Sequence, residues 1–193
     1  MWYVIQTITG REQELVEAID RVLKGRDYGK CFVIYQECVW RIEGGYKTYI
    51  KPMFPSYVFA ETGDPERFFF ALKQVPKFSR LLGSDGTFWP VKEEERKLLC
   101  GMTAGEHGCS RHYLLRRSTV WVNDMGEITA ADGFLGQHLD KIVKKRLRKR
   151  SVTIEIPFLG EMRRLQIGIR MEGEEPEESC LKRIETGVST EKG

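Results

Sequence analysis

The chain has 193 residues, of which 41% are hydrophobic and 31% charged, so it can bury a core and is not expected to be an unfolded tail. It contains neither a run of about 18 apolar residues nor a charged-then-apolar leader, and we therefore expect neither a membrane-spanning nor a secreted protein. Its five irregularly spaced cysteines favour reduced thiols in the cytoplasm over a disulfide framework.

The net charge of +3 is unevenly distributed along the chain. Residues 106–170 carry 13 Lys and Arg against 7 Asp and Glu, whereas residues 1–105 carry 15 against 14. Residues 171–193 are acidic, with 3 against 7. Concentration of positive charge in one stretch is typical of a protein that binds a polyanion.

The first hundred residues predict an α+β domain with an open sheet. Residues 2–8 are aromatic and β-branched, as in a buried strand. Thr9 and Glu12 fit a capping box, and apolar residues then recur at helical spacing from Leu15 to Leu23. Asp64 and Pro65 predict the start of a second helix. Further strands are expected at residues 32–35, 38–42, 46–50, 57–61 and 78–82, and a third helix at residues 92–102.

Two details of this region are specific predictions. We expect Gln36 and Glu37 to interrupt the strand material between residues 32 and 42, because neither is a typical strand residue in a buried sheet. Gly44 and Gly45 predict a hairpin or a mobile turn before the next strand.

The second half of the chain has an apolar period of two. Buried and exposed positions alternate at residues 152–156 and again at 165–169, and Gly133, Gly136 and Gly160 fall at expected corners. This pattern predicts a small all-β barrel. The predicted organisation is a first domain at residues 1–104, a linker at 105–117, the barrel at 118–173 and an acidic, disordered tail at 174–193.

An aromatic cluster precedes and enters the strand at residues 57–61. Tyr57 and Phe59 share one face of this strand, and flanking prolines stiffen the chain around Phe54. These rings are either ordinary core or an exposed patch that receives a partner helix, since aromatic anchors dominate interface energetics.

The most basic segment lies at residues 141–150, where seven of ten residues are cationic and none is acidic. The alternatives are a solvated strand and turn, or a surface for nucleic-acid phosphates; the lack of mixed charge favours the second. The predicted cationic residues are Lys141, Lys144, Lys145, Arg146, Arg148, Lys149 and Arg150, with Arg163 and Arg164 as an extension of the surface.

No motif indicates catalysis, and we expect no catalytic residue, cofactor or metal. The three histidines stand apart from any nucleophile, and neither a phosphate-binding loop nor a dinucleotide fingerprint occurs. A competing hypothesis is a thiol- or zinc-dependent enzyme built on Cys100, His107, Cys109 and His112. That spacing departs from the paired-cysteine pattern of structural zinc sites.

The motifs resemble a known family. Residues 2–7 with Gly10 and Glu12, then residues 54–59, 76–83 and 90–95, are similar to the NGN domain of NusG-type transcription elongation factors. Residues 126–128 and 133–135, Ile142 and the strand leading to Gly160 resemble the KOW domain of the same family. Residues 144–150 and 154–160 are most similar to the specialised LoaP paralogues that accompany particular long operons.

This resemblance implies a fold and a mechanism. The fold is an NGN domain, an antiparallel sheet with flanking helices, followed by a five-stranded, SH3-like KOW barrel. The NGN domain binds the clamp coiled coil of the largest RNA polymerase subunit, with Phe54, Tyr57 and Phe59 in the pocket and Trp2 and Tyr3 beside it. The implied protein is a cytoplasmic monomer that promotes processivity and antitermination and also lies near upstream DNA.

In the LoaP-like branch the second domain binds a hairpin in the nascent RNA, for which Gln137 and His138 are further candidate contacts. The alternative is a general, housekeeping NusG whose KOW domain binds a ribosomal protein or Rho. Asp140 and His138 depart from the pattern expected for those protein contacts, which favours the RNA hypothesis.

Overall fold

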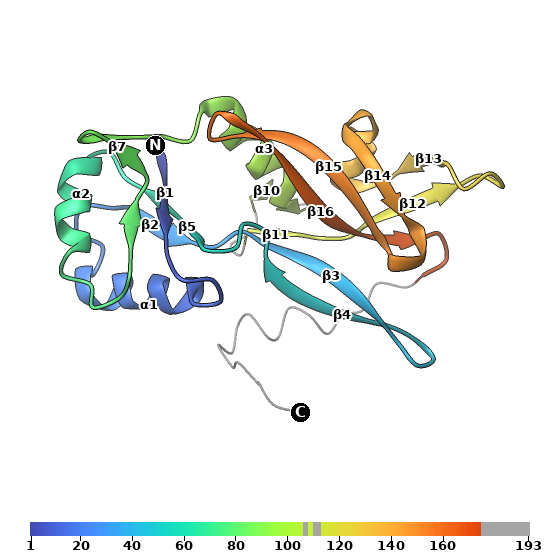
Figure 1. Cartoon of the computed structure of the whole chain (residues 1–193), viewed down its shortest axis with the longest axis horizontal. Coiled ribbons are helices and arrows are strands. Elements are labelled where there is room, and N and C mark those ends of the chain that lie inside the picture. Colours follow the sequence, from blue (N-terminus) through green and yellow to red (C-terminus); the bar gives the residue numbers. More distant parts are fainter. Residues whose placement is uncertain (106–107, 110–112, 175–193) are drawn as a thin grey trace. The chain divides into compact units, whose positions relative to one another are not determined.

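The computed structural model describes residues 1–105, 108–109 and 113–174, and the chain forms two compact units (Figure 1). Unit 1 comprises Met1–Tyr35, Pro52–Tyr113 and Pro157–Arg163. Unit 2 comprises Gln36–Lys51, Leu114–Ile156 and the chain from Arg164 onward. Each unit thus combines segments that are distant in sequence.

Unit 1 is built on an antiparallel sheet with strand order β2-β5-β1-β6. Its helices are α1 (Glu12–Leu23), α2 (Pro65–Leu72) and α3 (Glu93–Thr103). Its sheet strands are β1 (Trp2–Gln6), β2 (Lys30–Phe32), β5 (Tyr57–Glu61) and β6 (Arg80–Leu81). Two short ribbons complete it, β7 (Gly83–Ser84) with β8 (Thr87–Phe88), and β9 (Ala104–Gly105) with β10 (Gly108–Cys109).

The two faces of this sheet have different neighbours. The register pairs Tyr3 with Ala60 and Ile5 with Val58, and these four side chains join the core formed with helices α1 and α2. Alternation directs Phe59 to the opposite face. The predicted division of the strand, with Val58 on one side and Phe59 on the other, is therefore confirmed.

The helix starts confirm one capping prediction and correct another. Asp64 caps α2, its carboxylate accepting a hydrogen bond from the Arg67 backbone N–H (3.0 Å), with Pro65 in the first turn. The capping box at Thr9 and Glu12 is wrong. Helix α1 begins after Arg11 without a side-chain cap, because the buried Glu12 carboxylate instead accepts from the Ser56 backbone N–H (2.6 Å).

Unit 2 contains a three-stranded sheet, order β11-β3-β4, and a five-stranded sheet, order β13-β12-β16-β15-β14. The first is formed by β3 (Tyr35–Ile42), β4 (Gly45–Pro52) and β11 (Leu114–Leu115). The second is formed by β12 (Ser118–Val122), β13 (Ile128–Ala131), β14 (Ile142–Arg146), β15 (Ser151–Phe158) and β16 (Glu161–Met171), of which Pro157–Arg163 belong to unit 1. Three short helices lie between strands of the five-stranded sheet. Helices α4 (Gly133–Gly136) and η1 (Leu139–Lys141) connect β13 to β14, and η2 (Leu147–Lys149) connects β14 to β15.

The five-stranded sheet curls into a half barrel around an apolar interior. Val152, Ile154 and Ile156 of β15 are buried, as are Leu165, Ile167 and Ile169 of β16, which confirms the predicted period of two. Strands β13 and β14 are the two ends of the strand order and, among the described residues, are not paired with each other. Closure into a complete barrel therefore stays a prediction.

The long hairpin β3–β4 corrects the predicted interruption at Gln36 and Glu37. Strand β3 runs continuously through both residues, because Gln36 is buried and the Glu37 carboxylate accepts from the Arg117 backbone N–H (3.1 Å). The turn follows the two glycines as predicted, and Gly44 has a positive φ of 83° that favours glycine. Gly168 of β16 lies so close to the Glu37 backbone that a Cβ atom would collide with its carbonyl oxygen.

We expect Gly168→Ala to destabilise unit 2 by about 1–3 kcal/mol, because the added methyl group has to displace backbone rather than a flexible side chain. Chemical denaturation of the full chain measures this change. Gly45→Ala, on the β3–β4 hairpin, is the matched control, since nothing lies within 4 Å of its added Cβ. Equal stability of the two variants would contradict the close approach of β16 to β3.

Candidate nucleic-acid and protein interfaces

The basic run of residues 141–150 forms the outer edge of the five-stranded sheet. Its first half lies on η1 and edge strand β14, and its second half on η2. A shift of register between Ile142 and Lys144 leaves the strand irregular. Lys144, Lys145 and Arg146 are consecutive exposed residues, and Arg148 and Lys149 are exposed beyond them.

Six of the seven cations have no acidic partner among the described residues. In the part of the chain that the structure describes, no ion pair involves Lys141, Lys144, Lys145, Arg146, Arg148 or Lys149. Like charges this close repel one another, and an anionic ligand relieves that repulsion. The segment therefore has the electrostatics of a phosphate-binding surface.

Arg150 differs from the other six. Its guanidinium binds the Glu174 carboxylate (2.6 Å and 2.7 Å) and donates to the Leu147 carbonyl oxygen (2.8 Å). It also lies over the ring of Tyr46, 4.6 Å from the centroid. Arg150 is thus a neutralised, half-buried residue that organises the end of the basic run.

The other residues predicted to contact RNA lie outside the basic run. Arg163 pairs with Glu161 (3.4 Å) and the exposed Arg164 with Glu155 (2.7 Å), so both lie in surroundings of mixed charge. Gln137 is exposed on the loop after α4.

His138 packs on the ring of Phe134, at 4.4 Å between centroids. Burial, followed by the nearby Lys141, lowers the pKa of His138 below its ordinary value. The imidazole therefore contributes little positive charge near neutral pH.

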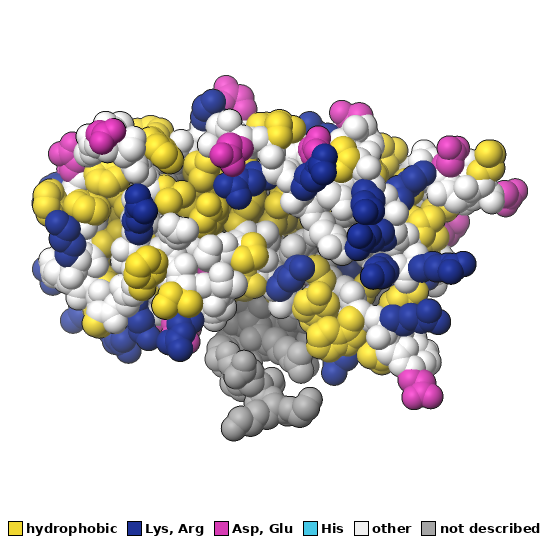
Figure 2. All heavy atoms as spheres, in the orientation of Figure 1, with side chains coloured by type: hydrophobic (Ala, Val, Ile, Leu, Met, Phe, Trp, Pro, Cys, Tyr) yellow, Lys and Arg dark blue, Asp and Glu magenta, His cyan; other side chains and the backbone are white. Residues whose placement is uncertain are grey.

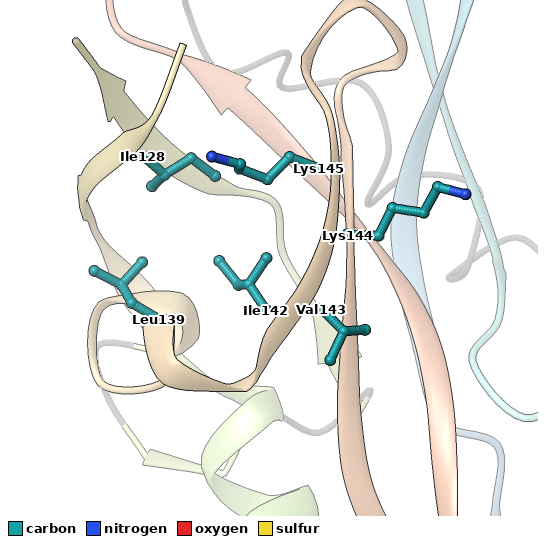
Figure 3. A pocket seen from close by; sticks show the side chains of 6 residues that line it. All are labelled: Ile128, Leu139, Ile142, Val143, Lys144 and Lys145. Carbon is teal, nitrogen blue, oxygen red and sulfur yellow. The ribbon is translucent and has the colours of Figure 1, made fainter. Parts of the chain in front are cut away.

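A small pocket opens beside the basic run (Figure 3). It has a volume of about 250 Å³ and is lined by Ile128, Leu139, Ile142, Val143, Lys144 and Lys145. Figure 3 shows Ile128 of β13 and Ile142 of β14 directed into the same space, with the Lys145 amine near Ile128 and the Lys144 side chain directed away. The pocket thus has an apolar floor and an ammonium group, that of Lys145, at its edge.

In unit 1, the predicted aromatic residues belong to a larger ring cluster. The cluster comprises Trp2, Phe32, Phe54, Phe59, Tyr113 and Phe158. Phe158 is fully buried; its ring lies 4.5 Å from Phe54 and 6.5 Å from the half-buried Tyr57, measured between centroids. Phe158 therefore covers the rings that the sequence predicted to meet a partner.

The structure brings Trp2 into this cluster and leaves Tyr3 out, since Tyr3 lies in the core on the helix side of the sheet. Sequence reasoning did not find Phe32, Tyr113 or Phe158 as members. The period of two in β15 identifies Phe158 as buried, but a pattern within one strand does not say which rings bury it.

The zinc hypothesis receives no support from the described residues, which contain no group of three His, Cys, Asp or Glu side chains placed to hold a metal. Of its four residues, Cys100 is half-buried on α3, while His107, His112 and the side chain of Cys109 lie outside what the structure describes. No helix among the described residues is long and apolar enough to span a bilayer.

A family model, described as transcription termination factor NusG, matches residues 1–100, which is more than half of the chain. The chain belongs to the NusG family. Members of this family are transcription factors that act on RNA polymerase. The LoaP subtype is a finer assignment that the family model does not make.

Among solved structures, the NusG-family chain is similar to one described as "Domain interaction in Thermotoga maritima NusG", with 16% sequence identity and a TM-score of 0.45. The similarity covers 87% of this chain and 93% of the Thermotoga maritima chain. No protein of curated function matches the sequence significantly.

We expect the Arg150–Glu174 pair to make the stability of unit 2 depend on pH. Burial raises the pKa of Glu174, but hydrogen bonds from Arg150 and the Met171 backbone outweigh it and hold the pKa below its ordinary value. The stabilisation is therefore complete above the carboxylate's ordinary pKa and is lost as the pH falls through the lowered one.

Glu174→Gln should lower the melting temperature at neutral pH and converge with the unmodified chain in acid. The exposed Glu172→Gln is the matched control, with no such convergence expected. A Glu174→Gln deficit that stayed constant down to acid pH would contradict an ionic contribution from this pair.

Proposed function

We propose that this NusG-family protein is a specialised processivity and antitermination factor of the LoaP type. In this proposal the ring cluster of unit 1 binds the clamp coiled coil of RNA polymerase, and the basic run binds a hairpin in the nascent RNA. The observation that carries the RNA assignment is the set of six neighbouring cations without an acidic partner among the described residues. The protein would act as a monomer, close to upstream DNA.

The geometry of the basic run suits the backbone of a folded RNA. Edge strand β14 and helix η2 present Lys144, Arg146 and Arg148 along an irregular segment, and phosphate contacts require no fixed base sequence. A-form RNA hides its base edges in a deep major groove. Phosphate binding therefore supplies affinity, and recognition of one particular hairpin needs additional contacts to unpaired bases.

A general NusG remains the second candidate, because the pocket at Ile128 and Ile142 has an apolar floor that would accept a protein side chain. Lysines on edge strand β14 would then serve mainly to prevent edge-to-edge aggregation. A general factor whose KOW domain binds a ribosomal protein or Rho needs no affinity for an RNA hairpin, so RNA binding separates the two candidates.

We expect the double variant Lys144→Glu, Arg148→Glu to lower affinity for an RNA hairpin at least about a hundredfold, because charge-assisted hydrogen bonds contribute about 1.5–3 kcal/mol each. Electrophoretic mobility shift or fluorescence anisotropy with the full chain measures this. Lys24→Glu with Arg26→Glu, two exposed cations of unit 1, gives the same change in net charge and should bind nearly normally. Equal losses in the two double variants would show only a general effect of charge.

Polymerase binding by the ring cluster requires Phe158 to leave it, since that ring covers Phe54 and Phe59. Phe158→Ala should therefore strengthen polymerase binding, although removal of the buried ring lowers the free energy of unfolding by about 3–5 kcal/mol. Tyr57→Ala should weaken binding about tenfold or more, as expected for an aromatic anchor.

Co-purification with core RNA polymerase, at a temperature where both variants are folded, compares them directly. The opposite signs of the two effects distinguish an interface from a structural role. If Phe158→Ala and Tyr57→Ala weakened binding alike, the rings would be core and the polymerase surface would lie elsewhere.

A further inference from the structure

The β3–β4 hairpin of unit 2 carries an exposed aromatic pair that the proposed surfaces do not include. Trp40 is 51% exposed, and its ring stacks on Tyr49 at 4.9 Å between centroids and 26° between planes. Tyr49 is half-buried and therefore holds one face of the indole in place. A large aromatic ring that is packed on one face and exposed to solvent on the other can stack on a nucleic-acid base.

The hairpin carries two exposed cations, Arg41 and Lys47, and one exposed acidic residue, Glu43 at its turn. Within the described ranges neither of these cations forms an ion pair. Ile42 adds a further exposed apolar side chain, at 46%. Figure 2 shows hydrophobic side chains gathered over β3 and β4 beside Lys and Arg side chains over β14. An open aromatic ring beside the cations of the basic run complements a polyanion that also has exposed bases.

The hairpin contacts the basic run directly, through a hydrogen bond and a cation–π contact. The Tyr46 hydroxyl donates to the Arg148 carbonyl oxygen (3.1 Å), and the Arg150 guanidinium lies on the Tyr46 ring. Arg150 is in turn fixed by Glu174. These contacts hold the hairpin against η2, and Figure 2 shows hydrophobic side chains of the hairpin and cations of β14 on one face of unit 2.

We propose that Trp40 stacks on an unpaired base of the RNA whose phosphates bind the basic run. This inference rests on the proposed RNA-binding function and adds to it a contact that distinguishes looped from fully paired RNA. A hairpin supplies both ligands at once, stem phosphates for the cations and loop bases for the indole. The neighbouring cations of the basic run favour RNA over an apolar protein helix, which would leave their charge without a partner.

The test compares two RNA probes on the full chain, a hairpin with a uridine loop and the blunt-ended duplex of the same stem sequence. Trp40→Ala should lower affinity for the hairpin about tenfold or more and leave affinity for the duplex unchanged, because stacking on an aromatic side chain contributes about 1–3 kcal/mol per base. Trp40→Phe, which keeps a ring, should lose much less. Trp89→Ala is the matched control, since Trp89 is 47% exposed but lies in unit 1.

Each outcome is informative. Retention of full hairpin affinity by Trp40→Ala, or equal loss for both probes, overturns the stacking contact while the proposed function stands. Failure of the unmodified chain to bind either probe contradicts the proposed function and this inference with it. If Trp40→Ala leaves RNA binding intact but weakens co-purification with polymerase, the aromatic pair is a protein interface and the inference is wrong.

Discussion

Mutual repulsion among the unpaired cations of β14 and η2 is the constraint on which this account depends. Globular proteins usually mix charges of both signs on a surface, and unit 2 does so at Arg164, which pairs with Glu155. Along residues 141–149 it does not. Among the residues that the structure describes, Arg150, at the end of the run, is the one cation of the run with an acidic partner. The contrast within one unit suggests that the other cations are kept available for an external anion.

The two proposed surfaces differ in what prepares them for binding. The basic run is exposed and needs no rearrangement before it meets phosphates. In unit 1, by contrast, Phe54 and Phe59 are buried under Phe158, so a partner has to exchange one ring contact for another. A partner that displaces Phe158 loses the free energy of the existing ring contacts before it gains its own. Removal of Phe158 is therefore expected to favour binding of the partner. In the proposed function, affinity for RNA and affinity for polymerase would therefore have different physical origins.

Local patterns predicted the elements well and their partners poorly. Strand β5 and the Asp64 cap follow from composition and turn chemistry, and the buried positions of β15 and β16 follow from a period of two. The capping box at Thr9 and Glu12 is wrong because the hydrogen-bond partner of Glu12, the Ser56 backbone N–H, is distant in sequence. The interruption at Gln36 and Glu37 is wrong for the same reason, since the Arg117 backbone N–H, which donates to Glu37 within the strand, is also distant. The basic run was evident from charge alone, whereas the neutralisation of Arg150 and the covering of Phe54 depend on tertiary contacts that no local pattern encodes.

The salt dependence of RNA affinity tests the central claim most directly, because it counts the phosphates that the cations neutralise. The measurement is the dissociation constant of the full chain for an RNA hairpin over a series of salt concentrations. If five of the six unpaired cations meet phosphates, log affinity should fall against log salt with a slope of about −3.5 for single-stranded contacts and about −4.5 for duplex-like contacts. A slope near zero, or the same steep slope after Lys144 and Arg148 are reversed in charge, would contradict the account.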